Sequence, residues 1–262
     1  MGNLSIEALL EIRELLEKKY HQFNQSYFIE HDPIQIPHRF SKKQDIEITG
    51  LLIATIAWGN RKMIIKNGFN LLEIMEDNPL EFVLNYDSKD LVHSHFVHRT
   101  FNHQDLDFFL RGLKKCYTNH VSLESWFNGP ADAHNCKPHL LHFRSKLFAT
   151  THASRSEKHV SNPEKGSAAK RLNMFLRWMV RRDKNAVDFG VWDSISPAQL
   201  CIPLDVHTGR VARSIGLLQR KQNDWKTVEE LMQALRLFDP VDPVKYDYAL
   251  FGLGVFEPNS FR

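Results

Sequence analysis

Residues 202–213 read Ile202-Pro203-Leu204-Asp205-Val206-His207-Thr208-Gly209-Arg210-Val211-Ala212-Arg213. An apolar lead-in ends at Asp205, whose carboxylate predicts the N-cap of a helix that continues to Leu217. Val211 and Ile215 turn inward on that helix, and Gly216 lies near its end. Because the apolar lead-in would bury the start of the helix, we expect backbone N–H groups to hold the Asp205 carboxylate in place.

The pattern predicts a second helix from Ala168 to Arg182, with Ser167 as its cap. This helix carries polar side chains that could take part in catalysis. One face carries an apolar stripe, and the other carries the basic residues Lys170, Arg171, Arg177 and Arg181. Lys170 lies in the first turn, where the positive end of the helix dipole disfavours an ammonium group. A neutral lysine can attack an electrophilic carbon and form a Schiff base, and Asp205 is suited to stabilising a cationic transition state or taking a proton. The alternative is that Asp205 is only a cap and Lys170 only a solvated charge.

The rest of the chain predicts an all-α protein of about ten helices, because apolar residues recur at steps of three and four and no long segment alternates. Thr151 to Gly166 is predicted to be a loop that is mobile in the free protein. The other expected helices cover 5–24, Asp45 to Trp58, Lys62 to Glu76, a short one opened by Asn78-Pro79, Gln104 to Tyr117, Ser122 to Phe127, His139 to Ala149, Thr227 to Leu237 through a capping box, and a last one opened by Asp242-Pro243.

Composition restricts the class of protein. The 262 residues are 42% hydrophobic and 25% charged, which excludes a disordered or low-complexity chain. The longest uncharged apolar run, residues 48–60, is too short to span a membrane. The N-terminus has no secretory pattern, and three widely spaced cysteines favour a reducing compartment, so we expect a cytoplasmic protein.

The net charge of +3 is unevenly distributed. Residues 137–184 hold 12 Lys and Arg against 3 acidic residues, so this block carries a net charge of +9 in a chain that is otherwise mildly acidic. Such a block is typical of a polyanion-binding face. The alternative is a solvated helix surface next to a mobile loop.

A zinc site is a further possibility, since Cys116, His120, His134 and Cys136 could together supply four tetrahedral ligands. Their spacing matches no common zinc motif, and buried cysteines with surface histidines are the alternative. The chain has no nucleophile elbow, phosphate loop or dinucleotide fingerprint, so hydrolase, nucleotidase and dehydrogenase chemistry is not indicated.

The quoted stretch resembles the segment that carries the catalytic aspartate in the helix-hairpin-helix DNA glycosylase superfamily, which includes endonuclease III and the 8-oxoguanine glycosylases. Gly166-Ser167-Ala168-Ala169-Lys170-Arg171-Leu172-Asn173 resembles the turn into the second hairpin helix, where bifunctional members keep their Schiff-base lysine. Residues 51–62 resemble the early buried helix and the lesion-reading turn. Asp205 follows Lys170 by 35 positions, a gap similar to that in the archaeal 8-oxoguanine glycosylase branch. Residues 170–180 with the Asp205 motif are also similar to a bacterial family of unknown function.

The resemblance implies a two-lobed helical glycosylase fold with a divergent helix-hairpin-helix, with residues 45–165 in one lobe and residues 1–44 with 166–262 in the other. It also implies an N-glycosylase/DNA lyase that excises an oxidised purine, 8-oxoguanine above all. Lys170 would attack C1′, and Asp205 would stabilise the developing charge. The partner would be double-stranded DNA with a flipped base in the bacterial nucleoid. No cofactor, metal or obligate protein partner is expected, and three cysteines are too few for the iron–sulfur cluster of endonuclease III. The implied DNA contacts are Gly166, Ser167, Arg171, His207, Arg210, Asn60, Arg61 and Lys62, and the implied base pocket is Trp58, Trp178 and Phe256.

Two other functions stay open. The glycine-rich Gly-Val-Gly hairpin turn of the superfamily is missing, since Gly166 is the only glycine there. This absence favours a DNA- or RNA-binding protein on the same scaffold without catalysis. The third possibility is a structural protein stabilised by zinc at the Cys and His residues named above.

Overall fold

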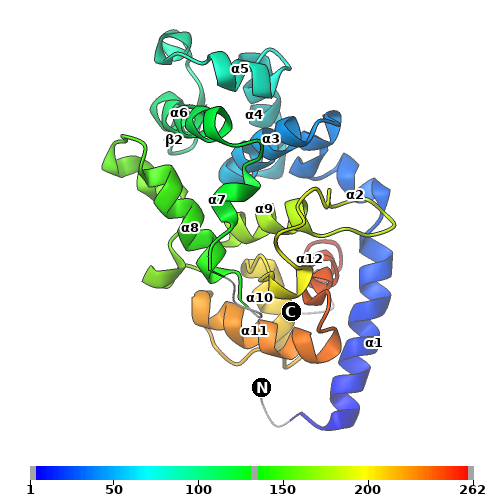
Figure 1. Ribbon diagram of the computed structural model, residues 1–262. Helices are drawn as coiled ribbons and strands as arrows, with labels where there is room; N and C mark the ends of the chain where they lie inside the picture. The colour runs from blue at the N-terminus through cyan, green and yellow to red at the C-terminus, as the bar shows by residue number, and fades with distance from the viewer. Residues whose placement is uncertain (1–3, 131–134, 259–262) are drawn as a thin grey trace. The chain divides into compact units, whose positions relative to one another are not determined.

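The structure, a computed structural model, describes residues 4–130 and 135–258 (Figure 1). Within these ranges the regular structure is almost entirely helical, which confirms the predicted all-α class. Short 3-10 helices connect several of the elements, and the strands found in the described residues form one antiparallel pair, in which Val97 faces Asn102. The α-helices and strands are α1 (Ile6–Phe23), α2 (Ser26–Glu30), α3 (Lys43–Ile56), α4 (Arg61–Ile74), α5 (Pro79–Asn85), β1 (Val97–His98), β2 (Phe101–Asn102), α6 (His103–Asn119), α7 (Glu124–Phe127), α8 (Lys137–Phe148), α9 (Lys170–Val180), α10 (Val206–Ser214), α11 (Trp225–Phe238) and α12 (Tyr246–Phe256).

The chain divides into two compact units. The first contains residues 4–28, 135–136 and 162–258 of the described chain, and the second contains residues 29–130 and 137–161. Residues 29–44, which we expected with the first unit, belong to the second because their two 3-10 helices, η1 (Pro33–Gln35) and η2 (Pro37–Arg39), pack on α3.

In the first unit, α12 packs against both α1 and α10 (Figure 1). Two glycines make this close approach possible, because a Cβ at Gly252 would collide with the Phe23 ring of α1, and a Cβ at Gly254 would lie 2.9 Å from Cβ of His207. The apolar stripe of α9 is buried as predicted, with Leu172, Phe175, Leu176 and Met179 inside the core.

In the second unit, α3 is the central helix and is buried nearly all round, as its composition predicts. Its one buried acid, Glu47, accepts hydrogen bonds from the Tyr117 hydroxyl (2.7 Å), the Ser122 hydroxyl and the N–H of Leu123 (3.0 Å). In the part of the chain that the structure describes, no helix is both long enough and apolar enough to cross a lipid bilayer.

Three predicted caps are wrong. Asp45 lies in the first turn of α3, and its Oδ1 accepts a hydrogen bond from the N–H of Leu80. The α11 helix begins at Trp225, earlier than the Thr227 capping box implies, because Asp224 accepts from the Thr227 N–H at 3.0 Å. Ser167 does not cap α9, whose N-cap position is occupied by Ala169 in the left-handed region at φ 48°.

The segment expected to be a mobile loop is folded. It contains two 3-10 helices, η4 (Ser154–His159) and η5 (Pro163–Lys165). The buried carboxylate of Asp105 anchors the first of them, since it accepts from Ser156 Oγ at 2.6 Å and from Arg155 Nη1 at 2.8 Å. The sequence alone does not predict this contact, because Asp105 lies in α6, 50 residues before Arg155.

Candidate functional site

The structure brings Lys170 and Asp205 together, with Lys170 Nζ 3.3 Å from Asp205 Oδ2. The two carboxylate oxygens of Asp205 have different partners. Oδ1 accepts from the N–H groups of His207 (2.8 Å) and Thr208 (2.9 Å), which confirms the predicted N-cap of α10. Oδ2 is left for the lysine, and the side chains are 34% and 13% exposed, so a ligand can reach the ammonium group.

Contacts near the start of α9 hold Lys170 in this position. The turn before α9 uses Gly166 at φ 86°, whose carbonyl accepts from the N–H of Trp225 at 3.0 Å. Asn173, one turn into α9, donates from Nδ2 to the carbonyl of Ala168 (3.1 Å) and to that of Ile202 (3.5 Å). The same amide therefore links the start of α9 to the lead-in of Asp205, and both are fixed before any substrate binds.

Beneath this pair, α9 carries two buried arginines that the sequence assigned to a polar face. Arg177 and Arg181 are 5% and 1% exposed, respectively. Arg177 is paired with Asp188 (3.2 Å) and, through a short contact, with Asp247 of α12. Carboxylates neutralise both arginines. Neither therefore adds to the positive charge with which the basic block, residues 137–184, could bind a polyanion.

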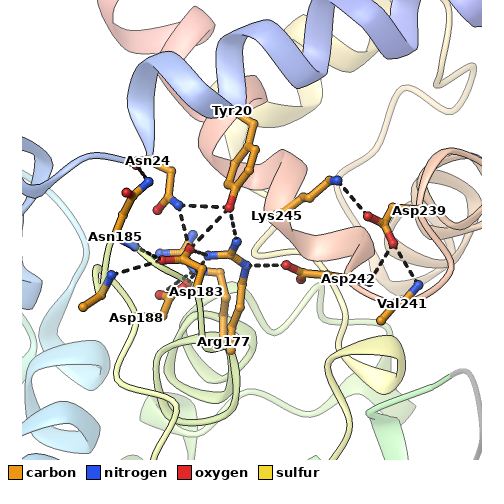
Figure 2. A network of polar contacts seen from close by, with 12 residues as sticks. Tyr20, Asn24, Arg177, Asp183, Asn185, Asp188, Asp239, Val241, Asp242 and Lys245 are labelled. Atoms are coloured by element: carbon orange, nitrogen blue, oxygen red, sulfur yellow. Dashed lines mark hydrogen bonds and ion pairs between the residues drawn. The ribbon is translucent and has the colours of Figure 1, made fainter.

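Arg181 binds three carboxylates in a polar network, and Figure 2 labels its partners Asp183, Asp188 and Asp242. Its guanidinium contacts the carboxylates of Asp183 (2.5 Å), Asp188 (3.1 Å) and Asp242 (2.9 Å). It also donates to the Tyr20 hydroxyl of α1 at 2.7 Å. Burial alone would lower the pKa of both arginines, but the neighbouring carboxylates, Asp188 foremost, raise it above the ordinary value.

From Lys170 to Arg181 the network holds three cations and five carboxyl groups, so it has more acids than bases. The buried Asp247 is the group most affected. Burial raises its pKa to about 7, and the charge of Asp205 acts in the same direction, while Arg177 and Lys170 oppose it. Asp247 thus gains and loses a proton near neutral pH, within electrostatic reach of the Lys170–Asp205 pair.

This raised pKa predicts a specific pH dependence of stability. The folded state binds a proton on Asp247 more tightly than the unfolded state, so its contribution to the free energy of unfolding falls as pH rises from 3.8 to about 7. We expect Asp247→Asn to lack this dependence, which amounts to on the order of 2–4 kcal/mol. Urea unfolding of the variant and the wild type between pH 5 and pH 8 measures it. Asp193→Asn, at a carboxylate that is 86% exposed, is the control, and parallel curves for Asp247→Asn and the wild type would contradict the assignment.

The other residues implied to contact DNA in the first unit lie around the same helix starts. Ser167 bridges to Asp224, and Gly166 is exposed. Arg171 is half-buried, and burial lowers its pKa to about 10, so it remains charged at neutral pH. His207 packs edge-on against Phe251, and Arg210 donates from Nη2 to the carbonyl of Gly254 at 2.8 Å.

The remaining implied DNA contacts lie in the second unit. Asn60 caps α4 by accepting from the N–H of Met63, Arg61 is half-buried, and Lys62 is exposed. Beside this turn, the guanidinium of Arg99 lies 4.6 Å from the ring centroid of Trp58. The sequence does not predict Arg99 as a site residue. Its backbone is left-handed at φ 57°, a conformation that no glycine indicates at this position.

The implied base pocket is only partly consistent with the structure. Trp178 is fully buried in the core of the first unit, so in this conformation its ring has no exposed face on which a base could stack. Trp58 is half-buried beneath Arg99. Phe256, 47% exposed, stacks on Phe23 with 5.6 Å between ring centroids.

The proposed zinc ligands do not form a site in the described residues, where no group of three or more His, Cys, Asp or Glu side chains could hold a metal ion. Cys116 belongs to the second unit and Cys136 to the first, and His120 is exposed. His134 lies outside the described residues. Burial raises the pKa of the Cys116 thiol to about 12.

The comparison with family models gives one finding. The chain belongs to the family described as "Protein of unknown function (DUF2400)", whose model matches residues 32–256 and therefore includes both Lys170 and Asp205. Neither the search of curated proteins nor the search of solved structures gives a match.

Proposed function

We propose that the protein is a DNA glycosylase with lyase activity that excises an oxidised purine, with 8-oxoguanine as the first candidate. The observation that carries the proposal is the 3.3 Å contact between Lys170 Nζ and Asp205 Oδ2 at the starts of two helices. A lysine nucleophile needs a neighbouring proton acceptor and a route for substrate, and this pair is suited to both needs. The resemblance of the two motifs to the helix-hairpin-helix glycosylases supplies the substrate class.

The chemistry would proceed as follows. Asp205 takes a proton from the ammonium of Lys170, and the freed electron pair attacks C1′ of the flipped nucleotide. The N-glycosidic bond breaks, and the base leaves with its electron pair and gains the proton that Asp205 took, which returns Asp205 to a carboxylate. The N,O-acetal at C1′ then opens to a Schiff base as the C1′–O4′ bond breaks and O4′ gains a proton, and loss of a proton from C2′ permits β-elimination of the 3′ phosphate. Asp205, fixed through Oδ1, keeps its second oxygen beside the positive charge that develops on the sugar.

Borohydride trapping tests the proposal directly. The purified protein is incubated with an 8-oxoguanine duplex, an abasic duplex and an undamaged duplex, each with borohydride. We expect a covalent adduct on the first two duplexes and none on the third. An adduct on the abasic duplex alone would support the lyase activity and contradict 8-oxoguanine as the excised base. The absence of an adduct on every duplex would contradict the Schiff-base mechanism.

A nucleic-acid-binding protein without catalysis is the second candidate function. The missing glycine turn favours it, because Gly166 alone offers less backbone for phosphate contacts than the usual hairpin. It predicts binding that weakens steeply with salt and produces no adduct. Either function would place the protein on nucleic acid in the cytoplasm.

The division of roles between the two oxygens of Asp205 makes Asp205→Asn informative. Asn keeps an oxygen that caps α10 but puts an amide toward Lys170, so the ion pair and the proton acceptor are lost. We expect base release in single turnover to slow on the order of 10²-fold while the thermal midpoint changes little. Asp205→Ala is the comparison, since it also loses the cap. Unchanged turnover in Asp205→Asn would remove Asp205 from the mechanism.

A further inference from the structure

The first unit contains two cysteines whose thiols meet in the core. Cys136 is fully buried and Cys201 is 3% exposed, and neither is in a disulfide. They come from segments 65 residues apart, yet their side chains hydrogen-bond to each other. Cys136 Sγ also lies 3.3 Å from Asn173 Oδ1, and Cys201 Sγ lies 3.7 Å from Asn135 Oδ1.

A basic group makes the two thiols unequal. Arg236 of α11 donates to the carbonyls of Leu200 (3.2 Å) and Ala198 (3.4 Å), which brings its guanidinium beside Cys201. Burial raises the pKa of both thiols. For Cys201 the hydrogen bond from Cys136 and the charge of Arg236 outweigh burial and lower the pKa, whereas the pKa of Cys136 stays well above its ordinary value. Of the two thiols, Cys201 therefore loses its proton more readily, and the Cys136 thiol lies in contact with it.

We propose that Cys136 and Cys201 form an oxidisable dithiol, a modification site at which hydroperoxides produce a reversible disulfide. The Cys201 thiolate attacks one oxygen of the peroxide, the O–O bond breaks, and the other oxygen leaves as hydroxide, so that Cys201 becomes a sulfenic acid. The Cys136 sulfur, having lost its proton to that hydroxide, then attacks the Cys201 sulfur and displaces a second hydroxide. The second hydroxide takes up the proton that Cys201 released, so that in total two thiols are oxidised, one hydrogen peroxide is reduced, and two waters are formed.

The disulfide would act on the site already described. Cys201 lies four residues before Asp205, and Cys136 hydrogen-bonds to Asn173, the amide that links α9 to Ile202. The Cys136 thiol would no longer be available as a donor to Asn173 after oxidation. The disulfide itself does not depend on the proposed glycosylase activity, so it is tested separately.

The test counts thiols in the folded, full-length protein. The wild type is treated with millimolar hydrogen peroxide, and the remaining thiols are alkylated after unfolding and weighed by mass spectrometry. We expect one alkylated thiol, on Cys116, with the loss of two hydrogen masses from the protein and a Cys136–Cys201 peptide in a non-reducing digest. Dithiothreitol should restore all three thiols.

Three variants serve as matched controls. Cys116→Ser should still form the crosslink, whereas Cys136→Ser should stop at a sulfenic acid that dimedone labels on Cys201, and Cys201→Ser should show neither product. Thermal unfolding of each variant verifies that it is folded. Three free thiols after peroxide treatment of the folded wild type, or equal oxidation of Cys116 and Cys201, would overturn the proposal.

Discussion

Replacement of Lys170 with alanine will abolish the borohydride-trapped adduct on both lesion and abasic duplexes, because the Schiff base needs that amine. We expect a loss of at least about 10²-fold in trapped product, which is the scale on which removal of a nucleophile acts. The fold will survive. Lys170 is 34% exposed and pairs with a carboxylate that backbone N–H groups already hold, so the ion pair contributes at most about 1 kcal/mol.

The matched control for this variant is Lys165→Ala. Lys165 lies five residues earlier in the 3-10 helix η5, is exposed, and is the closest alternative nucleophile in the basic block. We expect its adduct yield to match the wild type in parallel reactions. If Lys165→Ala loses the adduct and Lys170→Ala keeps it, the nucleophile is assigned to the wrong lysine. If Lys170→Ala unfolds the protein, measured by circular dichroism, the lysine is structural.

The second large effect is on stability. Arg181→Met will lower the free energy of unfolding by about 3–5 kcal/mol, because it leaves the carboxylates of Asp183, Asp188 and Asp242 without their shared cation. Methionine keeps much of the side-chain volume, so the loss reports the charge more than a cavity. In a protein of this size the thermal midpoint should fall by about 10 °C.

Arg182→Ala provides the contrast at the next position. Its side chain is 68% exposed, and its carboxylate partner Asp193 is 3.5 Å away and 86% exposed. We expect its stability to change by no more than about 1 kcal/mol. Differential scanning calorimetry of the two variants measures both values. Similar melting temperatures for Arg181→Met and Arg182→Ala would show that the buried network does not stabilise the fold.

Features of the candidate site that depend on neighbouring residues could be predicted from the sequence. The N-cap at Asp205 and the apolar stripe of α9 are correct, because a cap bonds to N–H groups two and three residues away and a stripe repeats with the helical turn. The sequence predicts Ser167 as the cap of α9, but Ala169 occupies that position with a left-handed backbone. Glycine often indicates a left-handed backbone in a sequence, whereas alanine does not.

Burial of charge could not be predicted in this way. The spacing of Arg177 and Arg181 fits an exposed basic face, but partners from the chain after α9 and from α12 bury both. Asp247 has no local pattern that distinguishes it from a surface acid. The 35 positions between Lys170 and Asp205 say nothing about their distance in space, and only the family resemblance suggested that they meet.

The order of residues along the chain therefore specified the helices and the cap that holds Asp205, because those interactions lie within a turn of their own residue. The tertiary structure decided which charges became a buried network, which lysine meets the carboxylate, and that Cys136 touches Cys201. These outcomes depend on desolvation and on partners tens of residues away, and a charge or a thiol changes its chemistry when such partners surround it.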